Sequence, residues 1–362
     1  MPTALYLHIG HGKTGSSYLQ SSLALSLPAL EAAGVCYPIA PDIARSAPEG
    51  NISGGNIQGQ PGAFAKLAAS GRVAADRPCL ISAESLFYYI LKHPQRFAED
   101  LATLRGPDSG PDSGPDSDPD GQPAPVHVLL YLRDPLDHAV SHYQQVVKRG
   151  NYTGTLAENL ATYRMPALTL RVLNSLREIG AKVTIRNYSL HRNRLLASME
   201  DWLDLPADTL APPPVGQVNR SPTRAELELQ RLVNLSKAQQ SWRVVSDPLC
   251  NKLPEIRSEQ PPLDPAALAE FLARMDAEMG ADDYAAAVPE AERPRVGTPQ
   301  DFDGRFPDPD SLTDYSFGAD QLHVLATAIG AELKRVGHLR EQLTMLREQL
   351  AMARGRAPSG TE

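Results

Sequence analysis

The stretch ALYLHIGHGKTGSSYLQSSLALSL, residues 4–27, decides the fold class. It opens on an apolar run of strand length that ends at a glycine-rich turn, and Leu19, Leu23 and Leu27 then recur at helical spacing. This pattern predicts a strand, a loop and a helix, which is the first unit of an α/β fold. A glycine-rich turn in this place also presents backbone N–H groups and the positive end of the helix dipole to an anion.

The alternation of strands and helices continues along the chain. A near-continuous apolar run, VHVLLYL, is typical of a strand in the middle of a parallel sheet that is covered on both faces. We therefore predict an α/β, P-loop-like three-layer fold with a central, mainly parallel sheet. Further strands are predicted at 35–38, 78–82, 126–132 and 181–190, and further helices at 28–34, 133–147 and 192–205.

The rest of the chain departs from this alternation. Residues 106–125 repeat GPDS and hold no large apolar side chain, so they predict a disordered low-complexity insert within the core. From about residue 206 the chain is rich in proline, and helices follow. We expect an α/β core over 1–235, which carries the family resemblance described below, a helical and irregular extension of the same domain over 236–330, and an amphipathic C-terminal helix over 331–355.

The predicted C-terminal helix has short heptad character. Its leucines follow a 4, 3, 4 spacing and are flanked by Arg and Glu, at Leu339, Leu343, Leu346 and Leu350. Three heptads at most are marginal for an independent coiled coil. Two alternatives stay open, namely packing against the helix's own domain and pairing in a homodimer.

Composition excludes several classes of function. A formal net charge of −8 argues against non-specific nucleic-acid binding, which needs clustered Lys and Arg. The three cysteines are far apart and never form a CxxC pattern, so buried free thiols are expected rather than a disulfide framework or a zinc site. No basic leader opens the chain and no run approaches the roughly 18 apolar residues of a membrane span. We expect no transmembrane segment and a cytoplasmic location.

The segment HGKTGSS, residues 11–17, carries the first functional hypothesis. Lys13 adds a full charge to the glycine turn, and the hydroxyls of Thr14, Ser16 and Ser17 add donors, so the turn suits a phosphate or a sulfate. Gly12, Lys13 and Thr14 also match the end of the Walker A pattern, GxxxxGK[ST]. The first glycine of that pattern would be residue 7, which is Leu7 inside the predicted strand, so the loop is too short for a Walker A.

The sequence here resembles a known family. HIGHGKTGSSYLQ resembles the 5′-phosphosulfate-binding loop of sulfotransferases that use 3′-phosphoadenosine-5′-phosphosulfate (PAPS). The resemblance implies that the donor is bound by the loop residues Gly12, Lys13, Thr14, Gly15, Ser16 and Ser17. YLRDPLDHAVSHYQQ resembles the family's 3′-phosphate motif, with Arg133 at a strand end and Ser141 eight residues later in the next helix. An arginine and a serine so spaced can converge on one phosphate.

A third segment, ISAESLFYY, is similar to a strand followed by Glu in carbohydrate sulfotransferases, where the carboxylate acts as the base. Glu84 is the matching residue. A helix-capping or salt-bridged glutamate is the structural alternative, and His11, beside the loop, is an alternative base. Residues 50–62, which are rich in glycine and amides, predict either an acceptor-binding loop or a surface connection.

Two departures from the family pattern concern the phosphate motifs. Ser16 and Ser17 stand where threonines are common, which keeps the hydroxyls, and His138 stands where many relatives have arginine. His138 and His142 are spaced i, i+4, but no third ligand follows, so a metal site is not predicted.

The resemblance spans roughly residues 4–235 and implies a bacterial, carbohydrate-sulfotransferase-like enzyme. Such an enzyme transfers a sulfuryl group from PAPS to an acceptor hydroxyl by in-line displacement and releases adenosine 3′,5′-bisphosphate (PAP), with no metal required. Lys13 is expected to stabilise the leaving phosphate and Glu84 to act as general base. The acceptor is expected to be a small molecule or a glycan, with carbohydrate or glycolipid favoured.

Two rival functions stay open at this point. One is a P-loop kinase or nucleotide hydrolase, which needs an acid after a strand, and Asp134 is the candidate for that acid. The other is a non-catalytic nucleotide-binding scaffold that assembles through the C-terminal helix.

Overall fold

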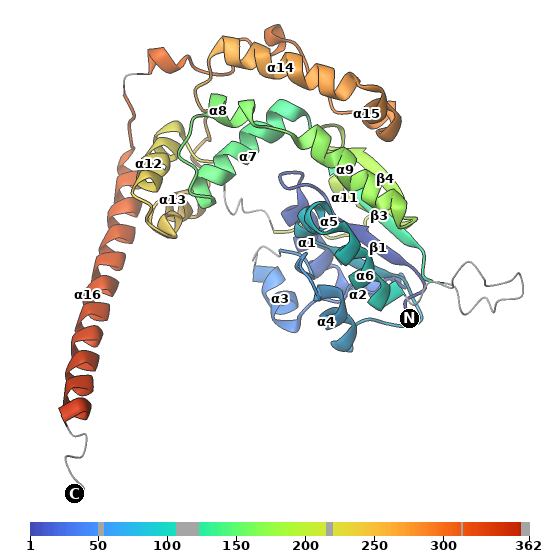
Figure 1. Ribbon diagram of the computed structural model, residues 1–362, viewed down its shortest axis with the longest axis horizontal. Helices are drawn as coiled ribbons and strands as arrows, with labels where there is room; N and C mark the ends of the chain where they lie inside the picture. The colour runs from blue at the N-terminus through green and yellow to red at the C-terminus, as the bar shows by residue number, and fades with distance from the viewer. Residues whose placement is uncertain (50–53, 106–122, 215–219, 313, 356–362) are drawn as a thin grey trace, which may run out of the picture. The chain divides into compact units, whose positions relative to one another are not determined.

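The computed structural model describes residues 1–49, 54–105, 123–214, 220–312 and 314–355 (Figure 1). The chain divides into two compact units. The first comprises Met1–Tyr143, Thr155–Gly216 and Pro262–Pro309, and the second comprises Gln144–Gly154, Gln217–Pro261 and Asp310–Glu362. Each unit is therefore made of several separate segments of the chain. The domains expected from the sequence are instead consecutive, with boundaries at 235 and 330, and they stay a prediction. Most of the predicted low-complexity insert, residues 106–122, lies outside the described residues.

The first unit is built on a four-stranded sheet in which every neighbouring pair is parallel, which confirms the predicted α/β class. The strands stand in the order β2-β1-β3-β4, and they comprise β1 (Leu5–His8), β2 (Cys79–Ser82), β3 (Val126–Leu132) and β4 (Lys182–Asn187). In register, Leu5 pairs with Cys79 on one side and with Val126 on the other. The carboxyl ends of β1 and its two neighbours therefore meet at one edge of the sheet.

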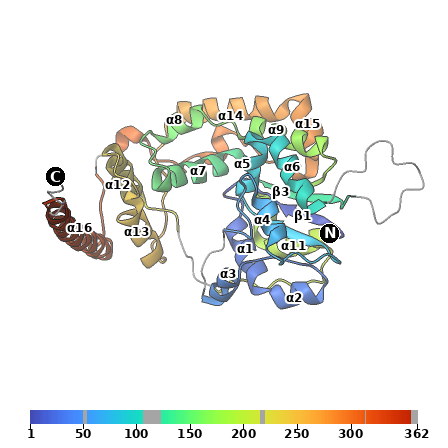
Figure 2. The ribbon, with the colours of Figure 1, turned by 60° about the horizontal axis from the view of Figure 1, so that its bottom comes forward.

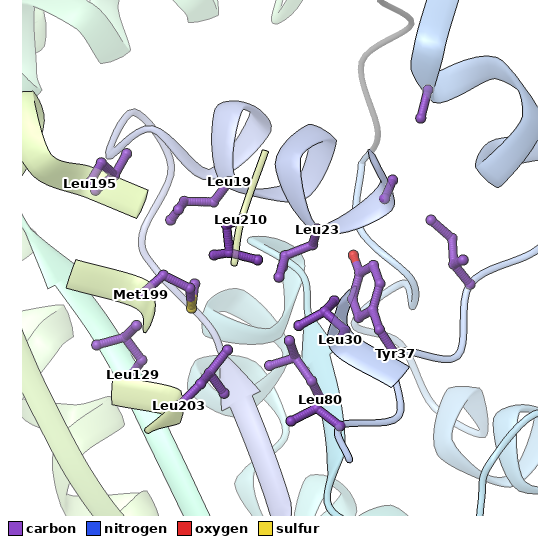
Figure 3. Packing of buried hydrophobic residues seen from close by; sticks show 14 of the residues in the cluster. Leu19, Leu23, Leu30, Tyr37, Leu80, Leu129, Leu195, Met199, Leu203 and Leu210 are labelled. Atoms are coloured by element: carbon purple, nitrogen blue, oxygen red, sulfur yellow. The ribbon is translucent and has the colours of Figure 1, made fainter. Parts of the chain in front are cut away.

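One face of the sheet is covered by α1 (Ser16–Leu25), α2 (Leu27–Ala32) and α11 (Leu195–Leu203). The helical spacing of Leu19 and Leu23 directs both side chains into a buried cluster that also contains Leu129 of β3 (Figure 3). Leucine side chains buried to this extent each contribute about 2 kcal/mol relative to exposure. This packing fixes α1, and with it the position of the loop that precedes α1.

The other face of the sheet is covered by α5 (Ser85–Lys92), α6 (Pro94–Arg105) and α9 (Met165–Glu178), where α9 packs against β4 and α5. Figure 2 shows these helices on the opposite side of the strands from α1 and α11. The remaining helices of this unit are α3 (Pro41–Ser46), α4 (Ala63–Ala69), α8 (Leu156–Ala161), α10 (Tyr188–His191), α14 (Pro265–Gly280) and α15 (Asp282–Ala287). A further helix, α7 (Pro135–Arg149), follows β3, beginning in the first unit and ending in the second.

The second unit contains α12 (Arg224–Leu235), α13 (Ser246–Lys252) and α16 (Ala319–Gly355). Thr223 and Glu226 form a capping box that starts α12. The Glu226 carboxylate is fully buried, where it forms an ion pair with Arg220 and accepts from the Gln321 amide at the start of α16. Val324 and Leu325 of α16 pack with Leu249 of α13 in a small core. The first turns of α16 are thus held by its own unit.

Three elements differ from their sequence predictions. The strand predicted at 181–190 is β4 only as far as Asn187, because Tyr188–His191 form the short helix α10, which the Asn187 side chain caps. The apolar run at 35–38 forms only an isolated bridge, in which Cys36 pairs in parallel with Cys79, because Pro38 ends the run and cannot donate to a ladder. The C-terminal helix begins at Ala319, twelve residues before the predicted start at 331, because its first apolar side chains contact α13. Across the described part of the chain, no helix combines the length and the apolar character needed to cross a membrane.

Candidate active site

The topology marks one place on the sheet for a ligand. The chain passes from β1 to β2 on one side of β1 and then to β3 on the other side, so the strand order reverses between β1 and β3. In open α/β sheets, ligands bind in the crevice at the carboxyl ends of the strands at such a switch point. The loop Ile9–Gly15 follows β1 at this point, and Arg133 follows β3. The structure therefore brings together two of the three segments that carry the sequence resemblance.

The loop after β1 holds an unusual backbone. Lys13 has a φ of 70° and Gly15 a φ of 79°. A left-handed conformation costs a residue with a Cβ atom about 1–2 kcal/mol, and such strain gathers at functional sites. The hydroxyl of Thr14 donates to the His11 carbonyl at 2.8 Å and helps to hold the turn. At Gly15 an added Cβ would lie 2.6 Å from Leu195 Cδ2, so this turn requires glycine for space as well as for its φ.

The start of α1 leaves hydrogen-bonding groups for a ligand. The first N–H groups of any helix have no partner within the helix. Ser16 opens α1, and its hydroxyl is buried yet has no hydrogen-bond partner among the described residues. The Oγ of Ser16 lies 3.3 Å from the position of a Cβ built on Gly10 in the same loop, whereas Ser17 is exposed. Because buried hydroxyls are normally partnered, this hydroxyl is available to a bound acceptor such as a phosphate oxygen.

Arg133 ties the end of β3 to the loop after β1. Its Nη1 donates to the Lys13 carbonyl at 2.9 Å, and its guanidinium lies 5.5 Å from the centre of the Tyr188 ring. This bond restrains the strained residue of the loop. A guanidinium has five N–H donors, so donation to one carbonyl leaves further donors for an anion.

A second tie to the loop comes from His138 in the first turn of α7. Its Nε2 lies 3.0 Å from the Gly12 carbonyl, which can only accept, so Nε2 carries the proton. Nδ1 of the neutral ring then accepts from the Tyr163 hydroxyl at 2.9 Å. Both ring nitrogens are engaged, so His138 positions the loop and has no lone pair for a metal. Among the described residues, no group of three His, Cys, Asp or Glu side chains is arranged to hold a metal ion.

Burial keeps the imidazoles near the loop neutral. Desolvation, followed by weaker effects that include repulsion from Arg133, lowers the pKa of His11 to about 4. Desolvation also lowers the pKa of His138 and of His142, and for His142 the nearby charge of Lys13 adds to the effect. At pH 7 the positive charge around the loop therefore comes from Lys13 and Arg133.

Glu84 lies on the other side of the loop, directly after β2. It occupies the N-cap position of α5, yet its side chain makes no capping hydrogen bond, which disagrees with the structural alternative of a helix cap. Its Oε2 lies 3.4 Å from the position of a Cβ built on Gly12, so the carboxylate faces the loop. Glu84 is half-buried, whereas the alternative base His11 is 2% exposed and donates from Nδ1 to the Gly12 carbonyl. Glu84 is thus the more accessible of the two.

A second glycine-rich segment, residues 54–62, lies beside β2. The side chain of Asn56 hydrogen-bonds to the backbone of β2, because its Nδ2 donates to the Leu80 carbonyl and its Oδ1 accepts from the Ser82 amide, each at 2.9 Å. A Cβ on Gly55 would lie 1.9 Å from the Ser82 carbonyl, so this close approach requires glycine. Residues 50–53 of the loop lie outside the described residues. A role in acceptor binding stays a prediction.

Ser141 is half-buried, about two turns into α7 and one turn beyond His138. Its convergence with Arg133 on one phosphate stays a prediction.

One segment near the site was not expected from the sequence. Residues 290–305 return to the ends of β3 and β4, where the Arg295 amide donates to Asp134 Oδ1 at 2.8 Å. Beside this contact lies a cavity of about 220 Å³, lined by Asp134, Leu136, Asp137, Arg295, Val296, Gly297, Asp301 and Phe302. A second cavity of about 400 Å³ shares Arg295 and Gly297. The signal in the sequence was RPRVG, two arginines and a glycine in a region without helical periodicity.

Comparisons with known proteins give no further assignment. No protein-family model matches the chain, and no curated protein has a significantly similar sequence.

Proposed function

We propose that this protein is a PAPS-dependent sulfotransferase that transfers a sulfuryl group to an acceptor hydroxyl. One observation carries the proposal. The loop of Lys13, the arginine of the RDP segment and the carboxylate of Glu84 meet at the carboxyl edge of the sheet, joined by the contact of Arg133 with the Lys13 carbonyl and by the approach of Glu84 to Gly12. These residues come from three separate segments that resemble the same family.

The loop and the start of α1 suit the 5′-phosphosulfate end of the donor. Backbone N–H groups at a helix N-terminus favour an anion, and Lys13 adds a full charge. The orphaned hydroxyl of Ser16 gains a partner when an anionic oxygen binds at the loop. We include in this proposal that the α/β fold is P-loop-like.

We assign the donor and the acceptor to different sides of the loop. Arg133 stands on the β3 side, and we assign the 3′-phosphate and the nucleoside to that side, where the cavity beside Asp134 gives room. Ser141 is the second proposed ligand of the 3′-phosphate. Glu84 stands on the β2 side, and we assign the acceptor to that side. A carbohydrate or glycolipid acceptor rests on the resemblance around Glu84.

The chain's residues then have distinct roles in the reaction. When bound, the donor supplies a sulfuryl group on a good leaving group, its 5′-phosphate. Glu84 accepts the proton of the acceptor hydroxyl as the oxygen attacks sulfur in line, and Lys13 stabilises the charge that grows on the bridging oxygen. Arg133 and His138 keep the loop carbonyls pinned, so its N–H groups stay preorganised toward that charge. None of these roles requires a metal.

Two features count against the kinase or hydrolase alternative. Leu7, at the position of the first Walker glycine, is fully buried within β1. Asp134 is the candidate acid, and its Oδ1 accepts from the Arg295 amide and from Asn187 Nδ2. This oxygen therefore has a structural role in joining the end of β3 to two other segments.

We further propose that α16 pairs with a second copy of this chain. Beyond its buried first turns, the helix exposes apolar side chains at heptad spacing, including Ile329, Leu343 and Leu350. Light scattering should report a dimer for the full chain and a monomer for Leu343→Lys with Leu350→Lys. A monomeric wild type would favour packing of the helix on its own chain.

Calorimetric titration with PAP and with adenosine 5′-monophosphate tests the donor assignment. We expect PAP to bind at least tenfold more tightly, without magnesium, because the 3′-phosphate adds charge-assisted hydrogen bonds. Equal affinity for the two nucleotides would contradict the proposal.

A further inference from the structure

Two of the three cysteines, distant in sequence, meet at the edge of the sheet. The Cys36 amide donates to the Pro78 carbonyl and the Leu80 amide donates to the Cys36 carbonyl, each at 2.8 Å, so Cys36 stands directly opposite Cys79. Residues opposite each other on neighbouring strands present their side chains to the same face, with strands about 4.8 Å apart. This spacing lies within the Cα separations that a disulfide spans, about 4.4–6.8 Å.

The two thiols have complementary environments. The Cys36 thiol donates to the Arg72 carbonyl at 3.4 Å. Cys36 is partly exposed and Cys79 is fully buried. The neighbouring Cys79 thiol, outweighing desolvation and helped by the nearby charge of Arg77, lowers the pKa of Cys36 to about 6. An accessible thiolate beside a second thiol is the arrangement found in redox-active pairs.

We propose that Cys36 and Cys79 form a reversible redox site, which a hydroperoxide converts to a disulfide. The Cys36 thiolate attacks the peroxide oxygen, so an S–O bond forms, the O–O bond breaks and the leaving oxygen takes a proton to become water or an alcohol. The Cys79 sulfur then loses its proton and attacks Cys36, so the S–S bond forms, the S–O bond breaks and water leaves. The two sulfurs lose two electrons in total and the peroxide gains them.

The position of the pair favours reversibility. Exposed disulfides are more easily reduced than buried ones, and Cys36 is partly exposed at the edge of the sheet. A thiol reductant should restore both cysteines. This site lies at the start of β2, and Glu84 follows the other end, so its chemistry does not depend on the transferase proposal.

Thiol counting and mass spectrometry on the full chain test this inference. Treating the reduced protein with a small excess of hydrogen peroxide should lower the titratable thiols of the unfolded chain from three to one. The peptides of Cys36 and Cys79 should appear joined, two hydrogens lighter, and dithiothreitol should separate them. Three remaining thiols, a disulfide that contains Cys250, or oxidation of Cys36 beyond the sulfenic acid without a bridge would overturn the inference.

Two cysteine variants serve as controls for the peroxide experiment. Cys250 is buried in the second unit, and burial raises its pKa, so Cys250→Ser should still form the bridge and retain no titratable thiol. Cys36→Ser should keep its two thiols after the same treatment. If either variant fails to fold, the wild-type measurement alone decides.

Discussion

The two sides of the loop after β1 are built differently. On the β3 side, Arg133 and His138 hold the carbonyls of Lys13 and Gly12, and Asp134 holds the Arg295 amide. On the β2 side, Glu84 faces the loop without a capping hydrogen bond. One side is committed to positioning, and the other presents a carboxylate for chemistry. Substitutions on the β2 side should therefore affect turnover, and substitutions on the β3 side should affect binding.

The largest effect is expected for Glu84→Gln. Glutamine keeps the shape of the side chain but cannot accept the acceptor proton, so turnover should fall about 100- to 10,000-fold while PAP still binds. Sulfuryl transfer from PAPS to a carbohydrate acceptor measures the loss. Glu99→Gln, at an exposed position on α6, is the matched control and should keep full activity. Wild-type turnover in the Glu84 variant would remove this residue from the mechanism.

Lys13→Ala tests the charged residue of the loop between the two sides. Alanine keeps the Cβ atom and so the backbone strain, but it removes the charge that stabilises the leaving phosphate. We expect kcat to fall about 100- to 1000-fold, as for other lost transition-state contacts, with a smaller change in donor affinity. Single-turnover kinetics separate the two quantities. An unchanged kcat with weakened binding would assign Lys13 to binding alone.

Arg133→Ala tests the β3 side. Loss of charge-assisted hydrogen bonds should weaken PAP about 10- to 100-fold and adenosine 5′-monophosphate much less. Arg133→Lys should recover only part of the affinity, because lysine lacks the planar fork and its stacking on Tyr188. Equal weakening of both nucleotides in calorimetric titrations would count against a 3′-phosphate role.

Gly15→Ala tests whether the loop geometry is required. The added Cβ would contact Leu195 and Tyr188 at a φ of 79°, so we expect a loss of about 2 kcal/mol in the free energy of unfolding. Gly34→Ala is the matched control, because its φ of 78° is similar but nothing lies within 4 Å of the new Cβ. Urea denaturation should show the larger loss at Gly15. Equal losses would mean that packing at the loop is not tight.

The smallest effect concerns pH. Burial holds the folded-state pKa of His11 at about 4, below its usual 6.5, so the unfolded chain binds its proton first as the pH falls. The stability contribution of the neutral ring is intact above pH 6.5 and is lost between pH 6.5 and 4, with about 1 kcal/mol gone at pH 5.5. His11→Gln should flatten this dependence in urea titrations, and the exposed His323→Gln should not. A pH profile unchanged by His11→Gln would contradict the assignment.

The sequence predicted the parts of this molecule that depend on local pattern. The apolar runs of β1 and β3 and the helical spacing of Leu19 and Leu23 follow from periodicity, so the all-parallel sheet and α1 were predictable. Leu7 was correctly expected to lie in a strand. The function and the roles of the site residues stay predictions.

What the sequence could not predict depends on contacts between distant residues. Arg295 reaches Asp134 across 161 positions, and no local pattern marks such a contact. The pairing of Cys36 with Cys79 arises because a chain leaving α2 lies along the edge of β2. From the sequence, His138 was only a histidine at a position where many members of the resembled family have arginine. Its hydrogen bonds to Gly12 and Tyr163 give it a role in positioning the loop.

Thermal stabilisation by nucleotides distinguishes a PAPS site from an ATP site. PAP without metal, at about 100 times its dissociation constant, should add about 2.7 kcal/mol to the free energy of unfolding and raise the melting temperature. ADP with magnesium at the same concentration should raise it much less. Stabilisation by ADP with magnesium and none by PAP would contradict the sulfotransferase proposal.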